Sequence, residues 1–231
     1  AHHRVDGIRE KYIEAVVGDT KLTRPLKVVA ACGNGTAGAF APDALRMMGA
    51  EVIEMDCNLD MTFPKYNPNP EDSEMLHAMA EMVRETGADV ALGFDGDGDR
   101  CGVVDNTGEE IFADKIGLML ARDLSKIYPN AKFVVDVKST GLYKTDPVLQ
   151  ENGATVDYYK TGHSYIKRRT TDLGALAGFE KSGHFFFREP IGLGYDDGLV
   201  AAKAVLEMLD RNPDKNMADL KGELGVAYTS L

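Results

Sequence analysis

The sequence predicts an α/β protein built from two tandem α/β/α three-layer domains of similar topology. Short apolar runs of strand length alternate with segments of helix length along the 231 residues. The order strand, glycine turn, helix, strand occurs twice, about a hundred residues apart. A second pair of matching segments each place an acidic residue directly after an apolar strand. We therefore predict duplicated domains at 1–109 and 110–231, divided at the polar turn DNTGEE near residues 108–112.

The first unit begins with the strand LKVVAAC (26–32), which is apolar over strand length. A glycine turn follows it, then a segment of helix length that ends in LRMMGA, then the strand EVIEMD (51–56). Methionines at positions 75, 79 and 82 have helical spacing, which favours a helix that packs them in the core. The strand ADVALGF (88–94) then leads into an acidic loop.

The second unit repeats this order with the strand KFVVDV (132–137), a glycine turn, a helix-length segment ending in LQENGA and the strand TVDYY (155–159). Gly35 and Gly141 occupy matching turns, at an offset of 141 − 35 = 106. A further strand leads into GFEKSGH, and HFFF continues as a strand. From 196 to 209, apolar residues recur every three or four positions, which predicts a helix.

Composition excludes several classes of protein. The net charge of −11 argues against a nucleic-acid or anionic-membrane binder. No apolar run approaches the roughly 20 residues that a membrane-spanning helix needs. The three cysteines, Cys32, Cys57 and Cys101, are odd in number and have no CxxC spacing, so they predict reduced thiols in a cytoplasmic protein.

The acidic loop GFDGDGDR (93–100) places Asp95, Asp97 and Asp99 on alternate positions, separated by glycines. Three carboxylates this close repel one another unless a cation lies among them. A set of carboxylate oxygens favours Mg²⁺, and three ligands leave coordination positions open for a phosphate oxygen. The alternative is a solvated acidic turn. Two Asp-Gly steps and a third aspartate directly after a buried strand favour the metal.

A dinucleotide-binding alternative comes from CGNGTAG (32–38). The motif Gly33-x-Gly35-x-x-Gly38 matches the dinucleotide fingerprint, and Glu54 and Asp56 follow at about the distance of a ribose contact. On this motif alone the chain would be an NAD-dependent oxidoreductase. The matching turn of the second unit, DVKSTGLY, lacks the glycine pattern, which favours a structural glycine turn.

The loop GFEKSGH (178–184) matches the acidic loop, because Gly93-Phe94-Asp95 aligns with Gly178-Phe179-Glu180. Carboxylate and hydroxyl groups can bind sugar hydroxyls, and an imidazole can transfer a proton near neutral pH. Lys138 and His163 could bind a phosphate. The alternative for the loop is an ordinary polar connection between strands, and from these residues alone the two interpretations are evenly matched.

The motifs GFDGDGDR, DVKSTG, KTGHSYIK, GFEKSGH and GYDDG, in this order, resemble the α-D-phosphohexomutases, closest to the phosphomannomutase/phosphoglucomutase branch. The resemblance extends over nearly the whole chain. It implies a four-domain enzyme of the isomerase class that interconverts hexose 1-phosphate and hexose 6-phosphate, of mannose or glucose. A phosphoserine gives its phosphate to the sugar, and a hexose 1,6-bisphosphate is the intermediate.

The resemblance also implies roles for individual residues. Asp95, Asp97 and Asp99 would hold Mg²⁺ beside the phosphoserine, and Arg100 would contact the substrate. The substrate-binding and catalytic residues that the resemblance implies in the second domain are Lys138, His163, Glu180, Lys181, Ser182, Gly183 and His184, of which His184 is the candidate for proton transfer.

The sequence departs from the family in one respect. It contains no Ser-His-Asn-Pro-like loop for the nucleophilic serine and no phosphate clamp of the fourth domain. We therefore expect the chain to be the two central domains of a longer enzyme, inactive alone, with the first and fourth domains as partners. The open alternatives are a stand-alone sugar-phosphate or metal-binding module and a phosphoglucosamine mutase.

Overall fold

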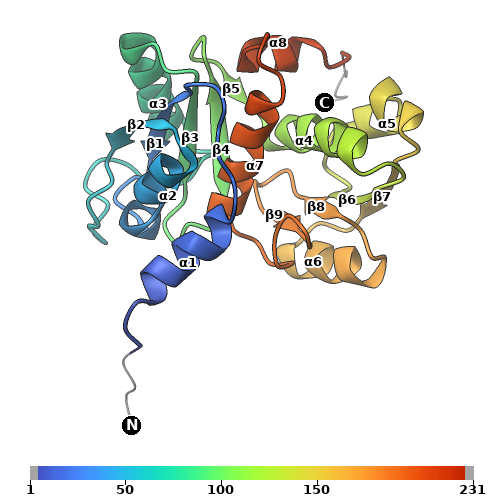
Figure 1. Ribbon diagram of the computed structural model, residues 1–231, viewed down its shortest axis with the longest axis horizontal. Helices are drawn as coiled ribbons and strands as arrows, with labels where there is room; N and C mark the ends of the chain where they lie inside the picture. The colour runs from blue at the N-terminus through green and yellow to red at the C-terminus, as the bar shows by residue number, and fades with distance from the viewer. Residues whose placement is uncertain (1–4, 227–231) are drawn as a thin grey trace.

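The computed structural model describes residues 5–226 and contains two mixed β-sheets flanked by helices (Figure 1). The first sheet has the order β2-β1-β3-β4-β5. Its strands are β1 (Lys27–Ala31), β2 (Glu51–Met55), β3 (Val90–Phe94), β4 (Cys101–Asp105) and β5 (Glu110–Ile111). The second sheet has the order β7-β6-β8-β9. Its strands are β6 (Lys132–Asp136), β7 (Thr155–Tyr159), β8 (Ala177–Phe179) and β9 (Phe185–Phe187).

The two sheets have the same topology, which confirms the predicted pair of α/β/α domains. In each, the first two strands and the third are parallel, and the fourth runs antiparallel to the third. A short 3₁₀-helix and an α-helix connect the first two strands of each sheet. These elements are η1 (Thr36–Ala39) and α2 (Ala41–Met48) in the first domain, and η2 (Gly141–Lys144) and α5 (Pro147–Glu151) in the second.

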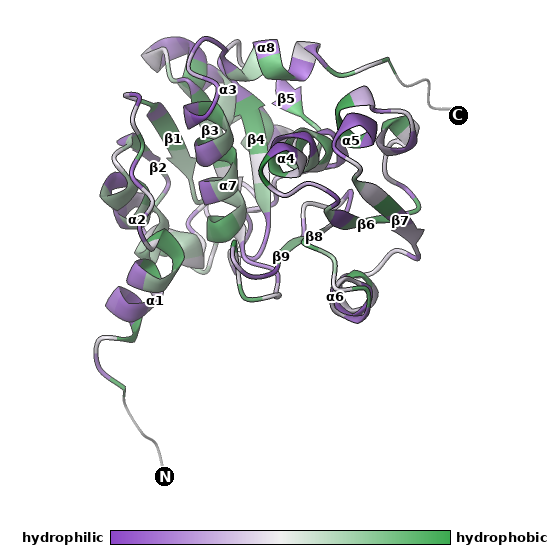
Figure 2. Ribbon diagram, turned by 45° about the vertical axis from the view of Figure 1, so that its right-hand side comes forward, coloured by the Kyte–Doolittle hydropathy of each residue, from purple (hydrophilic) through white to green (hydrophobic). Residues whose placement is uncertain are grey.

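The remaining helices cover the sheets and connect them. They are α1 (Ile8–Val17), α3 (Ser73–Thr86), α4 (Ala113–Ile127), α6 (His163–Asp172), α7 (Gly198–Asp210) and α8 (Met217–Gly222). The helix predicted over 196–209 is therefore present as α7. Figure 2 shows hydrophobic residues concentrated on the strands and on the helix faces that turn toward them. No helix within residues 5–226 is long and apolar enough to cross a membrane.

Alternate residues of each central strand enter different cores, as the pleat of a strand requires. In β1, Val28 and Ala30 pack in a core that extends to both sheets, whereas Val29 and Ala31 pack against α3. The shared core also contains residues of α4 and α7, such as Leu199. Figure 1 shows α7 in the middle of the molecule, between the two sheets. The two sheets are thus held by one continuous apolar cluster.

Polar contacts also tie α7 to the first domain. Asp197 caps α7 by accepting hydrogen bonds from the Leu199 and Val200 amides, at 2.9 and 3.1 Å, and from the Tyr12 hydroxyl. At the other end of the helix, Asp210 accepts a hydrogen bond from the Thr23 amide at 2.7 Å. Because α7 follows the second sheet in the chain, these contacts fix one domain against the other.

The polar turn DNTGEE is organised by the buried carboxylate of Asp105. Its Oδ1 accepts hydrogen bonds from the Thr107 and Glu109 amides at 2.9 and 3.0 Å, and Lys221 of α8 lies 3.3 Å from its Oδ2. Burial alone would raise the pKa of Asp105, but these hydrogen bonds and the lysine outweigh it and lower the pKa.

We expect Asp105→Asn to lower the free energy of unfolding by about 1–2 kcal/mol at pH 7, because the neutral amide loses the charge that strengthens the hydrogen bonds to Oδ1 and places a nitrogen opposite Lys221. A lowered pKa stabilises the fold above the ordinary value of 3.8, and this contribution disappears as the pH falls through the folded-state pKa. Urea unfolding of both proteins measures the difference. It should be constant from pH 7 to pH 5 and shrink below about pH 4; a difference that is independent of pH would contradict this role.

Candidate functional site at the meeting of two loops

The acidic loop between β3 and β4 is held in shape by Asp95, whose side chain is only 5% exposed. Its Oδ1 accepts hydrogen bonds from the Gly98 and Arg100 amides, both at 3.1 Å. Its Oδ2 accepts one from Arg100 Nε at 2.6 Å. Arg100 therefore folds back onto its own loop, and its predicted contact with substrate stays a prediction.

Oxygens of Asp95, Asp97 and Asp99 lie within 4.8 Å of one another. Partial burial and the neighbouring carboxylates raise the pKa of Asp99 to about 7, as expected where like charges are crowded. The Thr36 hydroxyl, buried and without a hydrogen-bond partner among residues 5–226, lies beside Gly98. An all-oxygen set of crowded carboxylates fits a hard divalent cation.

The glycine turn at 32–38 supports this loop. The Thr36 amide donates a hydrogen bond to the Gly96 carbonyl at 3.0 Å. A Cβ on Gly35 would lie 2.9 Å from that same carbonyl oxygen, and one on Gly38 would lie 2.0 Å from the Cys57 carbonyl oxygen. The protein's own backbone thus packs directly against Gly35 and Gly38, which accounts for these glycines structurally.

The two acids of the dinucleotide interpretation are also engaged. Glu54 pairs with Arg46 at 2.5 Å, and Asp56 accepts a hydrogen bond from the Tyr66 hydroxyl at 2.6 Å. Both carboxylates thus have partners within the protein, so the acidic residues that would contact a ribose also have a structural role.

The loop between β8 and β9 is a tight turn closed on itself. The Glu180 amide donates to the His184 carbonyl and the Gly183 amide to the Glu180 carbonyl, both at 3.0 Å. Gly183 has φ 95°, a conformation that favours glycine. Lys181 is exposed and Ser182 half-buried.

Glu180 has a side chain that is 2% exposed. Its Oε1 accepts a hydrogen bond from the Gly162 amide at 2.6 Å. Burial raises the pKa of this carboxyl group. The bond joins the loop to the segment that begins α6, so the carboxylate is held in one orientation.

The two loops meet. Arg100 and His184 are the last residues of their loops, and they form an antiparallel β-bridge. The Gly198 amide, at the start of α7, donates a hydrogen bond to the Gly98 carbonyl at 3.1 Å. A Cβ on Gly198 would lie 2.6 Å from the Arg100 carbonyl oxygen, so only glycine allows this approach. The acidic loop of one domain and the polar loop of the other are therefore in direct contact.

Asp196 joins this site, although the sequence interpretation gave it no role. Its Oδ2 lies 3.2 Å from Nδ1 of His184 and 3.8 Å from Nδ1 of His163, and its Oδ1 lies 3.3 Å from Nζ of Lys167. The rings of His163 and His184 stack with their centroids 5.7 Å apart. Asp99 Oδ1 lies 3.6 Å from the same His184 nitrogen, which connects this cluster to the acidic loop.

Lys138 and His163 follow the carboxyl ends of β6 and β7, and β6 lies beside β8, the strand that leads into Glu180. Ligands of open α/β sheets bind at such ends. His163 is the first residue of α6, and both side chains are exposed. Asp136, the last residue of β6, connects the segment that carries Lys138 to the loop between β8 and β9. Its Oδ2 accepts a hydrogen bond from the Lys181 amide at 3.4 Å.

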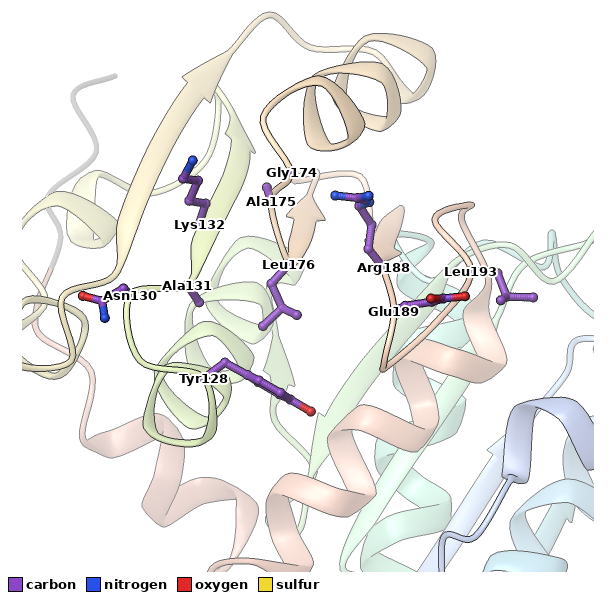
Figure 3. A pocket seen from close by; sticks show the side chains of 10 residues that line it. All are labelled: Tyr128, Asn130, Ala131, Lys132, Gly174, Ala175, Leu176, Arg188, Glu189 and Leu193. Atoms are coloured by element: carbon purple, nitrogen blue, oxygen red, sulfur yellow. The ribbon is translucent and has the colours of Figure 1, made fainter.

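A cavity lies at each end of the second sheet. One, of about 220 Å³, is lined by Lys181, Ser182 and Gly183 together with residues of the first domain such as Glu71. Another, of about 490 Å³, lies at the opposite end, where Lys132 begins β6 (Figure 3). The residues that line it in Figure 3 include none of the predicted site residues, so it is separate from the two loops.

Comparison with known proteins gives one consistent result. Residues 10–108 match the family model of phosphoglucomutase/phosphomannomutase α/β/α domain II, and residues 112–227 match that of domain III. A phosphomannomutase/phosphoglucomutase of Pseudomonas putida is 42% identical over 204 residues, which are 88% of this chain and 43% of the relative.

Two further relatives agree. A phosphoglucomutase of Neisseria meningitidis serogroup A is 40% identical over 215 residues, 92% of this chain and 46% of the relative. The crystal structure of a phosphoglucomutase/phosphomannomutase family protein from Burkholderia thailandensis has a TM-score of 0.88 and 36% identity, and the match covers 96% of this chain and 47% of that one. The chain thus spans a little under half the length of these relatives.

Proposed function

The chain belongs to the phosphoglucomutase/phosphomannomutase family, of which it contains domains II and III, and from this membership we propose that its two loops bind the metal and the sugar of a hexose-phosphate mutase. The whole enzyme would interconvert hexose 1-phosphate and hexose 6-phosphate through a phosphoserine and a bisphosphorylated sugar. The observation that carries the proposal is the bridge between Arg100 and His184, which joins the acidic loop to the sugar loop.

Asp95, Asp97 and Asp99 would hold Mg²⁺, which neutralises charge on a transferring phosphoryl group when it is bound. Asp95 has the further task of shaping the loop, through its hydrogen bonds to Gly98 and Arg100. The salt bridge with Asp95 also orients the guanidinium of Arg100, whose remaining N–H groups would contact substrate oxygens.

The sugar loop would bind hydroxyl groups of the hexose. Glu180 is held in one orientation by the Gly162 amide, and its other oxygen can accept a hydrogen bond from a sugar hydroxyl. Ser182, Lys181 and the Gly183 amide lie in the same turn. Lys138 and His163 follow β6 and β7 of the same sheet and would bind the phosphate at the non-reacting end of the substrate.

His184 would transfer the proton of the reacting hydroxyl. Asp196 would act as a positioning residue, since it lies 3.2 Å from the imidazole Nδ1 of His184. A carboxylate this close to one ring nitrogen limits the orientations that the ring can take. The ring of His163 stacks on one face of the His184 imidazole and restricts the movement of that ring.

Both mannose and glucose phosphates remain within this proposal, because they differ only at the 2-hydroxyl, and a phosphoglucosamine mutase is the alternative within the family. The division into domains at 108–112 and the cytoplasmic location also stay proposals. The dinucleotide alternative receives no support, since Gly35 and Gly38 pack against the protein's own backbone.

We expect Glu180→Gln to weaken binding of glucose 1-phosphate about fivefold in the presence of Mg²⁺, because a neutral amide is a poorer acceptor for a sugar hydroxyl. Mg²⁺ affinity should not change. Isothermal titration with each ligand measures both. Glu151→Gln, at the exposed end of α5, is the matched control. Equal sugar-phosphate affinity in all three proteins would remove Glu180 from the proposed site.

We expect no conversion of glucose 1-phosphate to glucose 6-phosphate by this chain alone, because its sequence contains no Ser-His-Asn-Pro-like loop to carry the phosphate. A coupled assay for glucose 6-phosphate, with the complete enzyme as the positive control, measures this. A robust rate from the chain alone would show that a group within it donates the phosphate and would contradict the proposed division of roles.

A further inference from the structure

Two cysteine sulfurs lie side by side next to the acidic loop. Sγ of Cys32 and Sγ of Cys57 are 3.4 Å apart. The register of the sheet brings them together: Ala31 of β1 pairs with Met55 of β2, and the Cys32 amide donates a hydrogen bond to the Met55 carbonyl at 3.0 Å. Each cysteine thus lies just past the carboxyl end of one of two adjacent parallel strands.

The two thiols differ in access. Cys32 is fully buried, whereas Cys57 is half-buried. The hydrogen bond between the two thiols lowers the pKa of Cys57 and raises that of Cys32. The more accessible sulfur is therefore also the one that is more readily a thiolate, which is the reactive form of cysteine. Cys101 is also buried, and burial raises its pKa, but its thiol donates to the Gly102 carbonyl at 3.7 Å and not to another sulfur.

We propose that Cys32 and Cys57 are a redox-modification site that a peroxide converts into a reversible disulfide. The Cys57 thiolate attacks one oxygen of hydrogen peroxide, the O–O bond breaks, and the departing hydroxide takes a proton and becomes water. The sulfur of Cys57 is then a sulfenic acid. Cys32 gives up its proton and attacks that sulfur, the S–O bond breaks, a second water leaves, and the S–S bond forms.

In sum, two thiols and one hydrogen peroxide give one disulfide and two waters: the sulfurs are oxidised and the peroxide is reduced. A dithiol reductant reverses the reaction by thiol–disulfide exchange. The disulfide would form at the glycine turn (32–38) that packs against the acidic loop. The Cys32 carbonyl accepts a hydrogen bond from the Gly35 amide of this turn, and the Cys57 carbonyl contacts Gly38. This inference does not depend on the proposed function, since it rests on the thiol pair alone.

The test uses the whole chain, hydrogen peroxide and mass spectrometry. Trypsin separates the three cysteines, because cleavage at Lys27, Arg46, Lys65 and Arg100 places Cys32 in peptide 28–46, Cys57 in 47–65 and Cys101 in a third peptide. We expect peroxide to lower the intact mass by about 2 Da, to leave one of three titratable thiols and to join peptides 28–46 and 47–65. Dithiothreitol should restore the starting mass.

Variants separate this pair from the third thiol. Cys101→Ala should behave as the wild type does, whereas Cys57→Ala should form no disulfide. If Cys57→Ala does not fold, the peptide map of the wild type decides alone. Three intact thiols after peroxide, overoxidised Cys57 without a joined peptide, or a disulfide that includes Cys101 would each overturn the proposal.

Discussion

Asp97→Asn is expected to lower the affinity of the chain for Mg²⁺ about 30-fold, or ~2 kcal/mol, while leaving the free energy of unfolding unchanged. Asp97 is exposed, and within residues 5–226 its side chain accepts no hydrogen bond that the fold would lose. Its carboxylate is one of the three that crowd together in the acidic loop. Titration with Mg²⁺ and urea unfolding without metal measure the two quantities.

Asp95→Asn is the matched comparison, because the same chemical change is made at a buried position. Asp95 accepts bonds from two amides and from the Arg100 guanidinium, so this variant should lose stability as well as metal affinity. If Asp97→Asn unfolded the protein, or if it bound Mg²⁺ as the wild type does, the acidic loop would be a structural element and the metal assignment would be wrong.

Gly38→Ala is expected to lower the free energy of unfolding by about 3 kcal/mol or more. The new Cβ would lie 2.0 Å from the Cys57 carbonyl oxygen, and backbone atoms on both sides cannot move away without disturbing the first sheet. Chemical denaturation compares the variant with the wild type. A stable Gly38→Ala variant would show that the turn is less tightly packed than the structure indicates.

The matching turn of the second domain supplies the control. Gly141 begins η2, and a Cβ there would meet nothing within 4 Å, so Gly141→Ala should leave the unfolding free energy nearly unchanged. The same experiment separates a structural glycine from a ligand-binding one. NADH should not bind to the wild type; if it did, and Gly35→Val abolished it, the dinucleotide interpretation would be correct.

The fold could be predicted because the duplication appears as a repeated local pattern in the sequence. Strand-length apolar runs, glycine turns and helical spacing recur with nearly constant offsets, and each depends only on neighbours in the chain. The position of α7 between the sheets could not be predicted in this way. It depends on contacts such as Asp197 with Tyr12, which are far apart in sequence and have no periodic signal.

The same distinction applies to the site. Asp95, Asp97 and Asp99 could be recognised as a cluster because the loop is short and its chemistry is uniform. Asp196 could not, because it is brought beside His184 by an antiparallel bridge to Phe186, a pairing that leaves no periodic signal in the sequence. The motif GYDDG contained the signal, yet nothing in it distinguishes Asp196, beside the histidines, from Asp197, which caps a helix.

The most direct test of the two-loop site is an amide NMR titration of the chain, first with Mg²⁺ and then with glucose 1-phosphate. The Gly96 and Gly98 amides report on the acidic loop and the Gly183 amide on the sugar loop. Mg²⁺ should shift the first two, and the sugar phosphate should shift Gly183. If Mg²⁺ left Gly96 and Gly98 unchanged, or NADH shifted Gly33 and Gly35 instead, the assignment of the acidic loop to a metal and of GFEKSGH to a sugar would be contradicted.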